Sequence, residues 1–181
     1  MLTRAGKQAV QTFVNWTTQD NSRNSIPMFP SASIRNTGNE ERWVSAVTGN
    51  LLSSTNVVSN NWAGFQIGSG STAPAETDYK LNTQITSGFS GSLSYTERGI
   101  DNGSLYMEFG LLITNTGSSN LTVAEVGIVT NNIKCCNSSS ATSASNQDVM
   151  IERTLLSSPV TIAPTETTLI KYRVTSSMSF S

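Results

Sequence analysis

Carboxylates are the only side chains of this sequence that could carry acid and base catalysis, because the chain contains no histidine. Neither a Ser-His-Asp nor a Cys-His mechanism can operate without it, whereas two carboxylates can still act as proton donor and nucleophile when they converge in one cleft. The candidates stand singly along the chain: Asp78, Glu97, Asp101, Glu108, Glu125 and Glu152. Their spacing along the chain does not predict that any two of these carboxylates lie on one face. We therefore expect that the protein is not an enzyme.

Glu108 and Glu125 differ from the other acidic residues because each stands within an apolar stretch. A carboxylate in such a strand either faces solvent from the polar side of the sheet or pairs with an arginine, for example Arg153. Either arrangement gives these two residues a structural role.

Metal and cofactor sites are not predicted. Cys135 and Cys136 are adjacent, so a disulfide between them would be strained and a reduced pair is favoured. No further ligands stand at zinc spacing. The Gly68-Ser69-Gly70 run lacks the lysine and the spacing of a phosphate-binding loop. Calcium bound by Asp78 and Asp101 would suit a β-sandwich, but the acidic loop spacing that such sites use is absent.

The charge balance indicates neither a nucleic-acid nor a membrane partner. Eleven basic residues stand against 12 acidic ones, and no stretch concentrates the basic residues into a stripe that could neutralise phosphates. No window approaches the ~20 apolar residues of a membrane span, and the first residues contain no apolar run typical of a secretory signal. We expect a protein that stays in the cytoplasm of the cell that makes it.

The elements that must position these residues are predicted to be β-strands. The hydrophobic fraction is 36% and the charged fraction 13%, so that Ser, Thr, Asn and Gly make up the balance, as in short strands joined by polar turns. Strand patterns occur at 42–47, 62–67, 92–96, 104–115, 121–130, 149–156, 160–162 and 167–174. They predict an all-β, antiparallel β-sandwich with jelly-roll-like character over residues 61–181. The turn at 115–120 is expected to join its flanking strands as a hairpin. Glycines and a proline predict a loop at 68–75, after which the chain is expected to re-enter the fold at 78–81.

Residues 1–60 are predicted to be an extended N-terminal arm and lead-in segment. A short helix fits residues 2–14, but from Asn15 to about Glu41 the chain shows neither the helical nor the strand period and is interrupted by Pro27 and Pro30. The segment is either a flexible tail or an arm that binds a neighbouring subunit. Embedded apolar residues favour the arm and are our candidate partner-binding residues: Trp16, Ile26, Met28, Phe29 and Ile34.

Several phrases of the sequence resemble a known family. The run GFQIGSGSTAP at 64–74 is followed by Asp78-Tyr79-Lys80-Leu81, and this is similar to a "G-x-x-x-G-x-G-x-x-x-P … D-Y-x-L" phrase of small β-sandwich virion structural proteins of tailed bacteriophages. Later stretches also resemble that group: 113–117, 123–128, 151–155 and 159–164. The Ser-rich insertion at 137–147 and the N-terminal arm depart from its pattern.

The resemblance implies a structural component of the virion, in a capsid-decorating (cement) or a neck or tail position, that binds its neighbours and carries no other activity. Its partners would be other virion proteins, namely capsid, portal or neck, or tail subunits, and it would form a homo-oligomer in the assembly. It implies a location in the virion, with assembly in the host cytoplasm.

A second interpretation is a carbohydrate-binding or host-recognition module that uses the loops at 68–77 and 134–148. Exposed aromatic rings in those loops would favour it, because sugars stack on such rings. The two loops contain no aromatic residue, which argues against this interpretation.

Overall fold

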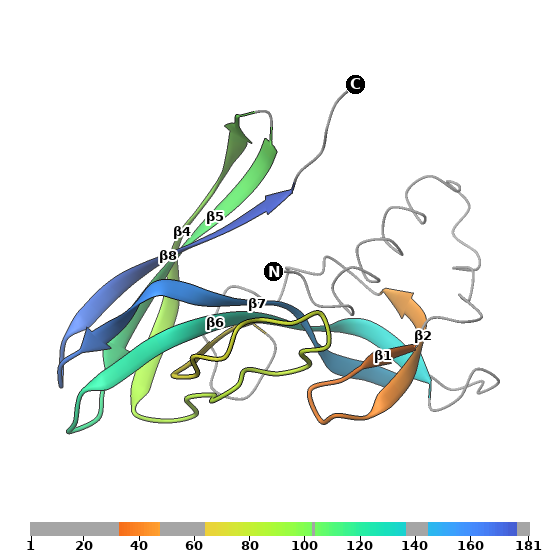
Figure 1. Ribbon diagram of the computed structural model, residues 1–181, viewed down its shortest axis with the longest axis horizontal. Coiled ribbons are helices and arrows are strands. Elements are labelled where there is room, and N and C mark those ends of the chain that lie inside the picture. Colours follow the sequence, from red (N-terminus) through yellow and green to blue (C-terminus); the bar gives the residue numbers. More distant parts are fainter. Residues whose placement is uncertain (1–32, 48–63, 103, 137–144, 177–181) are drawn as a thin grey trace.

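Two antiparallel β-sheets make up the computed structural model, which describes residues 33–47, 64–102, 104–136 and 145–176 (Figure 1). These residues contain eight strands and no helix. The strands are β1 (Ser33–Arg35), β2 (Glu41–Val47), β3 (Gly64–Gly68), β4 (Phe89–Asp101), β5 (Ser104–Asn115), β6 (Leu121–Cys136), β7 (Ser145–Ile162) and β8 (Thr167–Ser176). One sheet has the order β1-β2-β6-β3, with β7 also paired to β6, and the other has the order β4-β5-β8. The predicted all-β sandwich is confirmed.

The core lies between the two sheets and follows from the alternation of the strands. Phe109, Leu111 and Ile113 of β5 are buried, while the residues between them belong to the opposite face. From the other sheet, Phe65 packs against Phe109 with ring centroids 4.8 Å apart. The remaining core residues come from β3, β6, β7 and β8: Ile67, Val123, Val126, Ile128, Val149, Ile151, Ile162, Ile170 and Tyr172.

The expected hairpin between the strands that flank residues 115–120 is wrong. β5 pairs with β4 and β8, so both of its edges are occupied, and the turn carries the chain across to β6 in the other sheet. Buried Asn115 holds this crossing, because its side-chain amide donates to the carbonyls of Ser119 and Ile162, both at 2.8 Å. One side chain thereby connects the β5–β6 turn to the end of β7.

The two strands expected at 149–156 and 160–162 are a single strand, β7. Pro159 lies within it and is exposed. A proline cannot donate to a β-ladder and is tolerated at a bulge, where the ladder is interrupted. The register with β6 passes from Val160 opposite Val123 to Leu155 opposite Glu125, so residues 156–159, which include the proline, bulge out of the ladder and the strand continues on both sides of them.

β1 and β2 join the sandwich through β6, because Trp43–Val47 pair with Ile133–Cys136. The strand pattern at 42–47 is therefore confirmed. β1 lies in a stretch that we expected to be irregular, since three residues are too few for a period to be recognised and its partner β2 supplies the order. The predicted helix at 2–14 and the irregular stretch from Asn15 to residue 32 lie outside the described residues.

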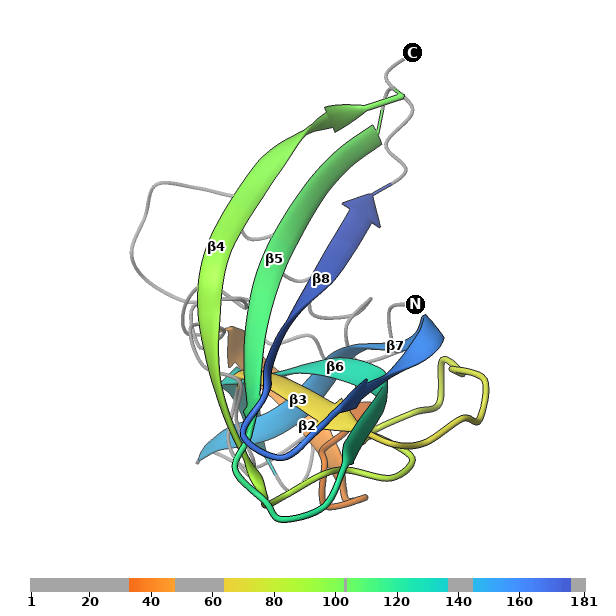
Figure 2. The same cartoon turned by 90° about the vertical axis from the view of Figure 1, so that its left-hand side faces the viewer.

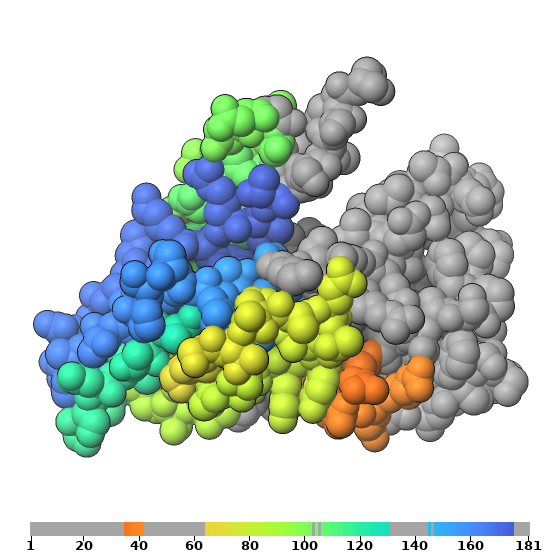
Figure 3. All heavy atoms as spheres, viewed as in Figure 1, coloured from red at the N-terminus to blue at the C-terminus, as the bar shows by residue number. Residues whose placement is uncertain are grey.

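A third layer covers the outside of the five-stranded sheet. The segment that follows β3, coloured yellow in Figure 3, is spread over this side of the molecule and returns beside β3, where the Ile85 amide donates to the Ile67 carbonyl at 2.9 Å. Leu81 is 1% exposed and forms a second small core with Val129 and Met150. The expected loop at 68–75 and the return of the chain at Asp78-Tyr79-Lys80-Leu81 are both confirmed.

The three-stranded sheet extends far beyond the five-stranded one. Figure 2 shows β4, β5 and β8 side by side as a curved sheet whose upper half rises above the rest of the molecule. β4 and β5 remain paired as far as Asp101 and Ser104, next to the turn that joins them. The face of this sheet that turns away from the core is called the outer face below.

Candidate functional site

A buried ion-pair cluster holds the segment between β3 and β4, residues 69–88, onto the five-stranded sheet, and we call this stretch the covering segment. Arg153 of β7 donates from Nε to Glu125 of β6 at 2.6 Å and from Nη1 to Asp78 of the segment at 2.8 Å. Its third contact is a 2.7 Å hydrogen bond from Nη2 to the carbonyl of Thr72. The side chain of Arg153 is 2% exposed and that of Glu125 0%. We call these groups the Arg153 cluster.

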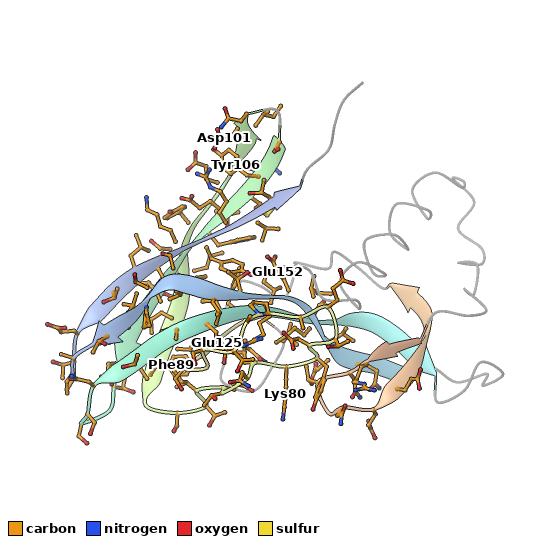
Figure 4. All side chains as sticks on the ribbon, in the orientation of Figure 1. Lys80, Phe89, Asp101, Tyr106, Glu125 and Glu152 are labelled. Carbon is orange, nitrogen blue, oxygen red and sulfur yellow. The ribbon has the colours of Figure 1, made fainter. Side chains whose placement is uncertain are left out.

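Glu125 accepts four hydrogen bonds, three of them from backbone amides of the covering segment. Gly70 donates at 3.1 Å, Asn82 at 3.1 Å and Thr83 at 2.7 Å, and Arg153 supplies the fourth donor. A carboxylate buried at this depth is stable only when it is paired and hydrogen-bonded. Glu125 is therefore the anchor on which both ends of the segment fold (Figure 4).

Two glycines make this approach possible. A Cβ atom at Gly68 or at Gly70 would lie 2.5 Å from Oε1 of Glu125, a distance that no side chain can hold. A third, Gly127 of β6, leaves room for Leu81, whose Cδ2 would be 2.9 Å from a Cβ there. The glycines thus allow the backbone to reach the carboxylate and the leucine to reach the sheet.

The Arg153 cluster corrects one expectation of the sequence analysis and confirms another. Asp78 and Glu125 converge on one side chain, although their spacing predicted no such meeting, because the covering segment folds back over β6. The pairing of a strand carboxylate with Arg153 is confirmed. The four hydrogen bonds that Glu125 accepts make it a structural anchor for the covering segment.

A second polar cluster covers the outer face of the three-stranded sheet. Tyr95 of β4 lies over Gly110 of β5 and donates from its hydroxyl to Glu108 at 2.8 Å. Tyr106 of β5 lies over Gly99 of β4 and donates to Glu97 at 3.1 Å. Each ring therefore occupies the space that a glycine of the neighbouring strand leaves open.

Arg173 of β8 connects this cluster across the sheet. It pairs with Glu108 at 3.0 Å and with Asp101 at 3.1 Å, and its guanidinium carbon lies 4.2 Å from the centre of the Tyr106 ring. Figure 4 shows Asp101 and Tyr106 near the far end of the sheet. Contacts to three strands hold these side chains in one arrangement.

The electrostatics of the outer face oppose proton transfer. The hydrogen bond from Tyr95, followed by that from Arg173, lowers the pKa of Glu108. The hydrogen bond to Glu108 raises the pKa of Tyr95, and the hydrogen bond to Glu97 raises that of Tyr106. Near neutral pH Glu108 is ionised and both phenols keep their protons. A general acid needs a carboxyl pKa that is raised toward neutrality, so Glu108 fits an ion pair better than a proton donor.

The acidic and basic residues of the outer face come from different edge strands, although the Arg173 guanidinium reaches across β5 to Asp101 of β4. Glu97 and Asp101 belong to β4, while Lys171 and Arg173 belong to β8, on the other side of β5. At the end of the face nearer the core, Leu112 and Leu169 are cross-strand partners and are 37% and 43% exposed. The face therefore combines tyrosines, charged residues of both signs and an apolar pair.

Glu152 and Tyr172 lie on the other side of the five-stranded sheet from the Arg153 cluster. Glu152 is the neighbour of Arg153 in β7, and its side chain points to the opposite face of the sheet, toward the core (Figure 4). Tyr172 of β8 is 3% exposed. Burial, followed by the charge of Glu152, raises the pKa of Tyr172.

The structure describes only one of the candidate partner-binding residues. Ile34 lies in β1, where its backbone pairs with Arg42 of β2, so it belongs to the sheet rather than to a free arm. Trp16, Ile26, Met28 and Phe29 lie outside the described residues, and their role stays a prediction.

Sequence reasoning missed the outer face. The signal was present as two-residue alternation in three stretches, in which Tyr95 precedes Glu97, Tyr106 precedes Glu108 and Lys171 precedes Arg173. Alternation places each pair on one face of its own strand. Only the register, in which Glu97 lies opposite Glu108 and Glu108 opposite Arg173, brings the three pairs together.

Within the described part of the chain, no group of His, Cys, Asp or Glu residues is arranged to hold a metal ion. The same residues include no helix that is long and apolar enough to cross a membrane. Comparisons with protein families, with curated proteins and with solved structures found no match for this chain.

Proposed function

We propose that this chain is a structural subunit of a tailed-phage virion, a capsid-decorating (cement) or a neck or tail protein that acts through contacts between subunits. The observation that carries the proposal is that the sequence phrases that resemble the phage family come into contact with one another in the fold. Gly70 and Asp78 of the first phrase contact Glu125 and Arg153 of the later ones at a single buried cluster. Chance matches scattered along the chain would have no reason to converge in this way, whereas the signature of a shared scaffold would.

The outer face supports a binding rather than a catalytic function. Its tyrosines and Arg173 are the residue types that carry most binding energy at protein interfaces. Hydrogen bonds and ion pairs already hold these side chains, so little conformational entropy remains to be lost when a partner binds. An extended surface whose side chains are held in place suits a subunit with repeated contacts.

The partners in this proposal are other virion proteins (capsid, portal or neck, or tail subunits) and further copies of the chain. The location is the virion, after assembly in the host cytoplasm. The N-terminal arm supplies a second contact through Trp16, Ile26, Met28 and Phe29. These residues precede β1, which begins at Ser33, so an arm would leave the sandwich at the edge of the five-stranded sheet.

Sedimentation of particles tests the proposal. Cells that carry the gene in its native genome are lysed, particles are separated on a density gradient, and the chain is followed by mass spectrometry. We expect it to sediment with the particles in a constant ratio to their other proteins. Recovery of the chain only among soluble proteins, in a lysate that contains particles, would refute the proposed function.

The arm is tested by changing Trp16, Ile26, Met28 and Phe29 together to serine. The expected result is a folded protein that is missing from sedimented particles. Ile34 is left unchanged because it belongs to the five-stranded sheet. Loss of the β-sheet circular dichroism signal in this variant would contradict a separable arm, and normal incorporation would show that the arm makes no essential contact.

The carbohydrate-binding interpretation has weaker support. Its loop at 68–77 contains no aromatic residue, and the Arg153 cluster fixes the middle of that loop to the sheet. On the outer face, the guanidinium of Arg173 already lies against the ring of Tyr106. A sugar would have to displace an arginine that two carboxylates and one aromatic ring hold in place.

A further inference from the structure

The charge pattern of the outer face has the symmetry of a surface that binds a copy of itself. Acidic Glu97 and Asp101 stand on β4 and basic Lys171 and Arg173 on β8, with β5 between them. A two-fold axis that runs along β5, parallel to the strands and just above the face, exchanges the positions of β4 and β8. Each basic strand would then lie over the acidic strand of the other copy.

The register matches charges and apolar groups across this axis. Glu97, Glu108 and Arg173 lie at one level of the sheet, so Arg173 of one copy would face Glu97 of the other. Ser92, Leu112 and Leu169 lie at another level. There the Leu112 side chains of the two copies would meet on the axis, and each Leu169 would cover Ser92 of the other copy.

One contact on the axis brings like charges together, and the structure compensates for it. Glu108 of β5 would approach its own copy. Each Glu108 already accepts hydrogen bonds from Tyr95 at 2.8 Å and from Arg173 at 3.0 Å. Its negative charge is therefore largely countered before the two faces meet.

We propose that the outer face of the three-stranded sheet binds a second copy of this chain, face to face, about a two-fold axis parallel to β5. The inference rests on the proposed function, because it names one of the subunit contacts that function requires. The partner is a second copy of the chain, because the arrangement of charges on the outer face is complementary to its own two-fold image.

The size of the face predicts a weak and reversible dimer. β5 has 12 residues, which at ~3.3 Å per residue gives a length of about 40 Å, and three strands about 4.8 Å apart give a width of about 14 Å. The planar area is therefore about 560 Å² per copy, at or below the lower limit of stable interfaces. Dissociation constants in the micromolar range are expected, so that the contact becomes fully occupied only in an assembly that repeats it.

Two exposed aliphatic residues of the same sheet provide a matched test. Leu169 is 43% exposed on the outer face, whereas Ile100 is 69% exposed on the opposite face, because it alternates with Asp101 of the outer cluster. In the full-length protein each is changed to aspartate, and the dissociation constant is measured by sedimentation equilibrium over a range of concentrations. Circular dichroism of each variant confirms that the sandwich is folded.

The expected result is a wild-type dimer whose dissociation constant rises about tenfold or more in Leu169→Asp and stays within about twofold in Ile100→Asp. Glu97→Arg and Arg173→Glu should each weaken the dimer, because each places like charges at the level where Arg173 of one copy faces Glu97 of the other. The two changes in one chain should restore much of the affinity. A wild-type protein that remains monomeric at the highest concentration overturns the inference. Equal effects of Leu169→Asp and Ile100→Asp overturn it as well.

The outcome is separable from that of the proposed function. A monomeric protein that still sediments with particles would refute self-association and leave the virion function in place. A dimer that never sediments with particles would support this contact and refute the virion function.

Discussion

Replacement of Arg153 by methionine is the sharpest test of how the covering segment is held. The change preserves much of the side-chain volume but removes the counter-charge of Glu125, which is 0% exposed. It also removes the 2.8 Å pair with Asp78 and the 2.7 Å hydrogen bond to Thr72. Removal of one partner of a buried ion pair costs about 3–5 kcal/mol, because the other charge is left without compensation.

That loss is large against the about 5–15 kcal/mol that separates folded from unfolded states in typical domains. With an m-value of about 2 kcal/mol per molar of urea, the unfolding midpoint should fall by about 1.5–2.5 M. The assay is urea unfolding followed by circular dichroism of the β-sheet. The slope should stay unchanged if the same surface is exposed on unfolding.

Arg173→Met is the matched control, since it removes the same chemical group from the outer face, where Arg173 is 42% exposed. Solvent screens its contacts with Glu108 and Asp101, so the midpoint should move much less. An Arg153→Met variant as stable as Arg173→Met would refute the reasoning that the covering segment depends on a buried charge cluster.

Three further outcomes follow from the same contacts. Gly70→Ala should lower stability by about 1–3 kcal/mol, because its Cβ would lie 2.5 Å from Oε1 of Glu125. Thermal unfolding of this variant is compared with that of Ser69→Ala, a change at the exposed neighbouring residue. Equal stability of the two variants would contradict the prediction. Glu108 has a folded pKa below its ordinary 4.5, so its contribution is present above that value and is lost as the pH falls through the folded pKa. The melting temperature of the wild type minus that of Glu108→Gln should therefore shrink from about pH 6 to about pH 3, and a constant difference would refute the ion pair. Tyr172 has a folded pKa above its ordinary 10.0, so the wild type should lose stability above about pH 10 while Tyr172→Phe loses less; identical alkaline melting profiles would exclude Tyr172 as a cause.

The alternation of side chains made most of the strands predictable. Stretches such as 104–115 and 167–174 alternate because one face of each strand packs in the core, and that requirement is written into every second residue. Glycine and proline marked the loop at 68–75 for a comparable reason, since their backbone preferences are local. The all-β sandwich could be inferred from these local signals.

Which strands share a sheet was decided only by the tertiary structure. The turn at 115–120 has the length of a hairpin loop, yet it joins two sheets, because β8 occupies the edge of β5 that a hairpin would need. The continuity of β7 through Pro159 depends in the same way on its partner β6, whose register with β7 leaves residues 156–159 as a bulge. Neither property belongs to the residues of the turn or of the strand.

The sequence alone determined the class of the fold, the absence of histidine chemistry and the pairing preference of strand carboxylates for arginine. The two polar clusters needed the folded chain. Arg153 brings together Asp78 and Glu125, which stand 47 residues apart (125 − 78), and the outer face joins residues of three strands through their register. Local patterns report which face of its own strand a side chain occupies. The contact of one strand's face with another's depends on strand order and register, which only the packing of the whole chain sets.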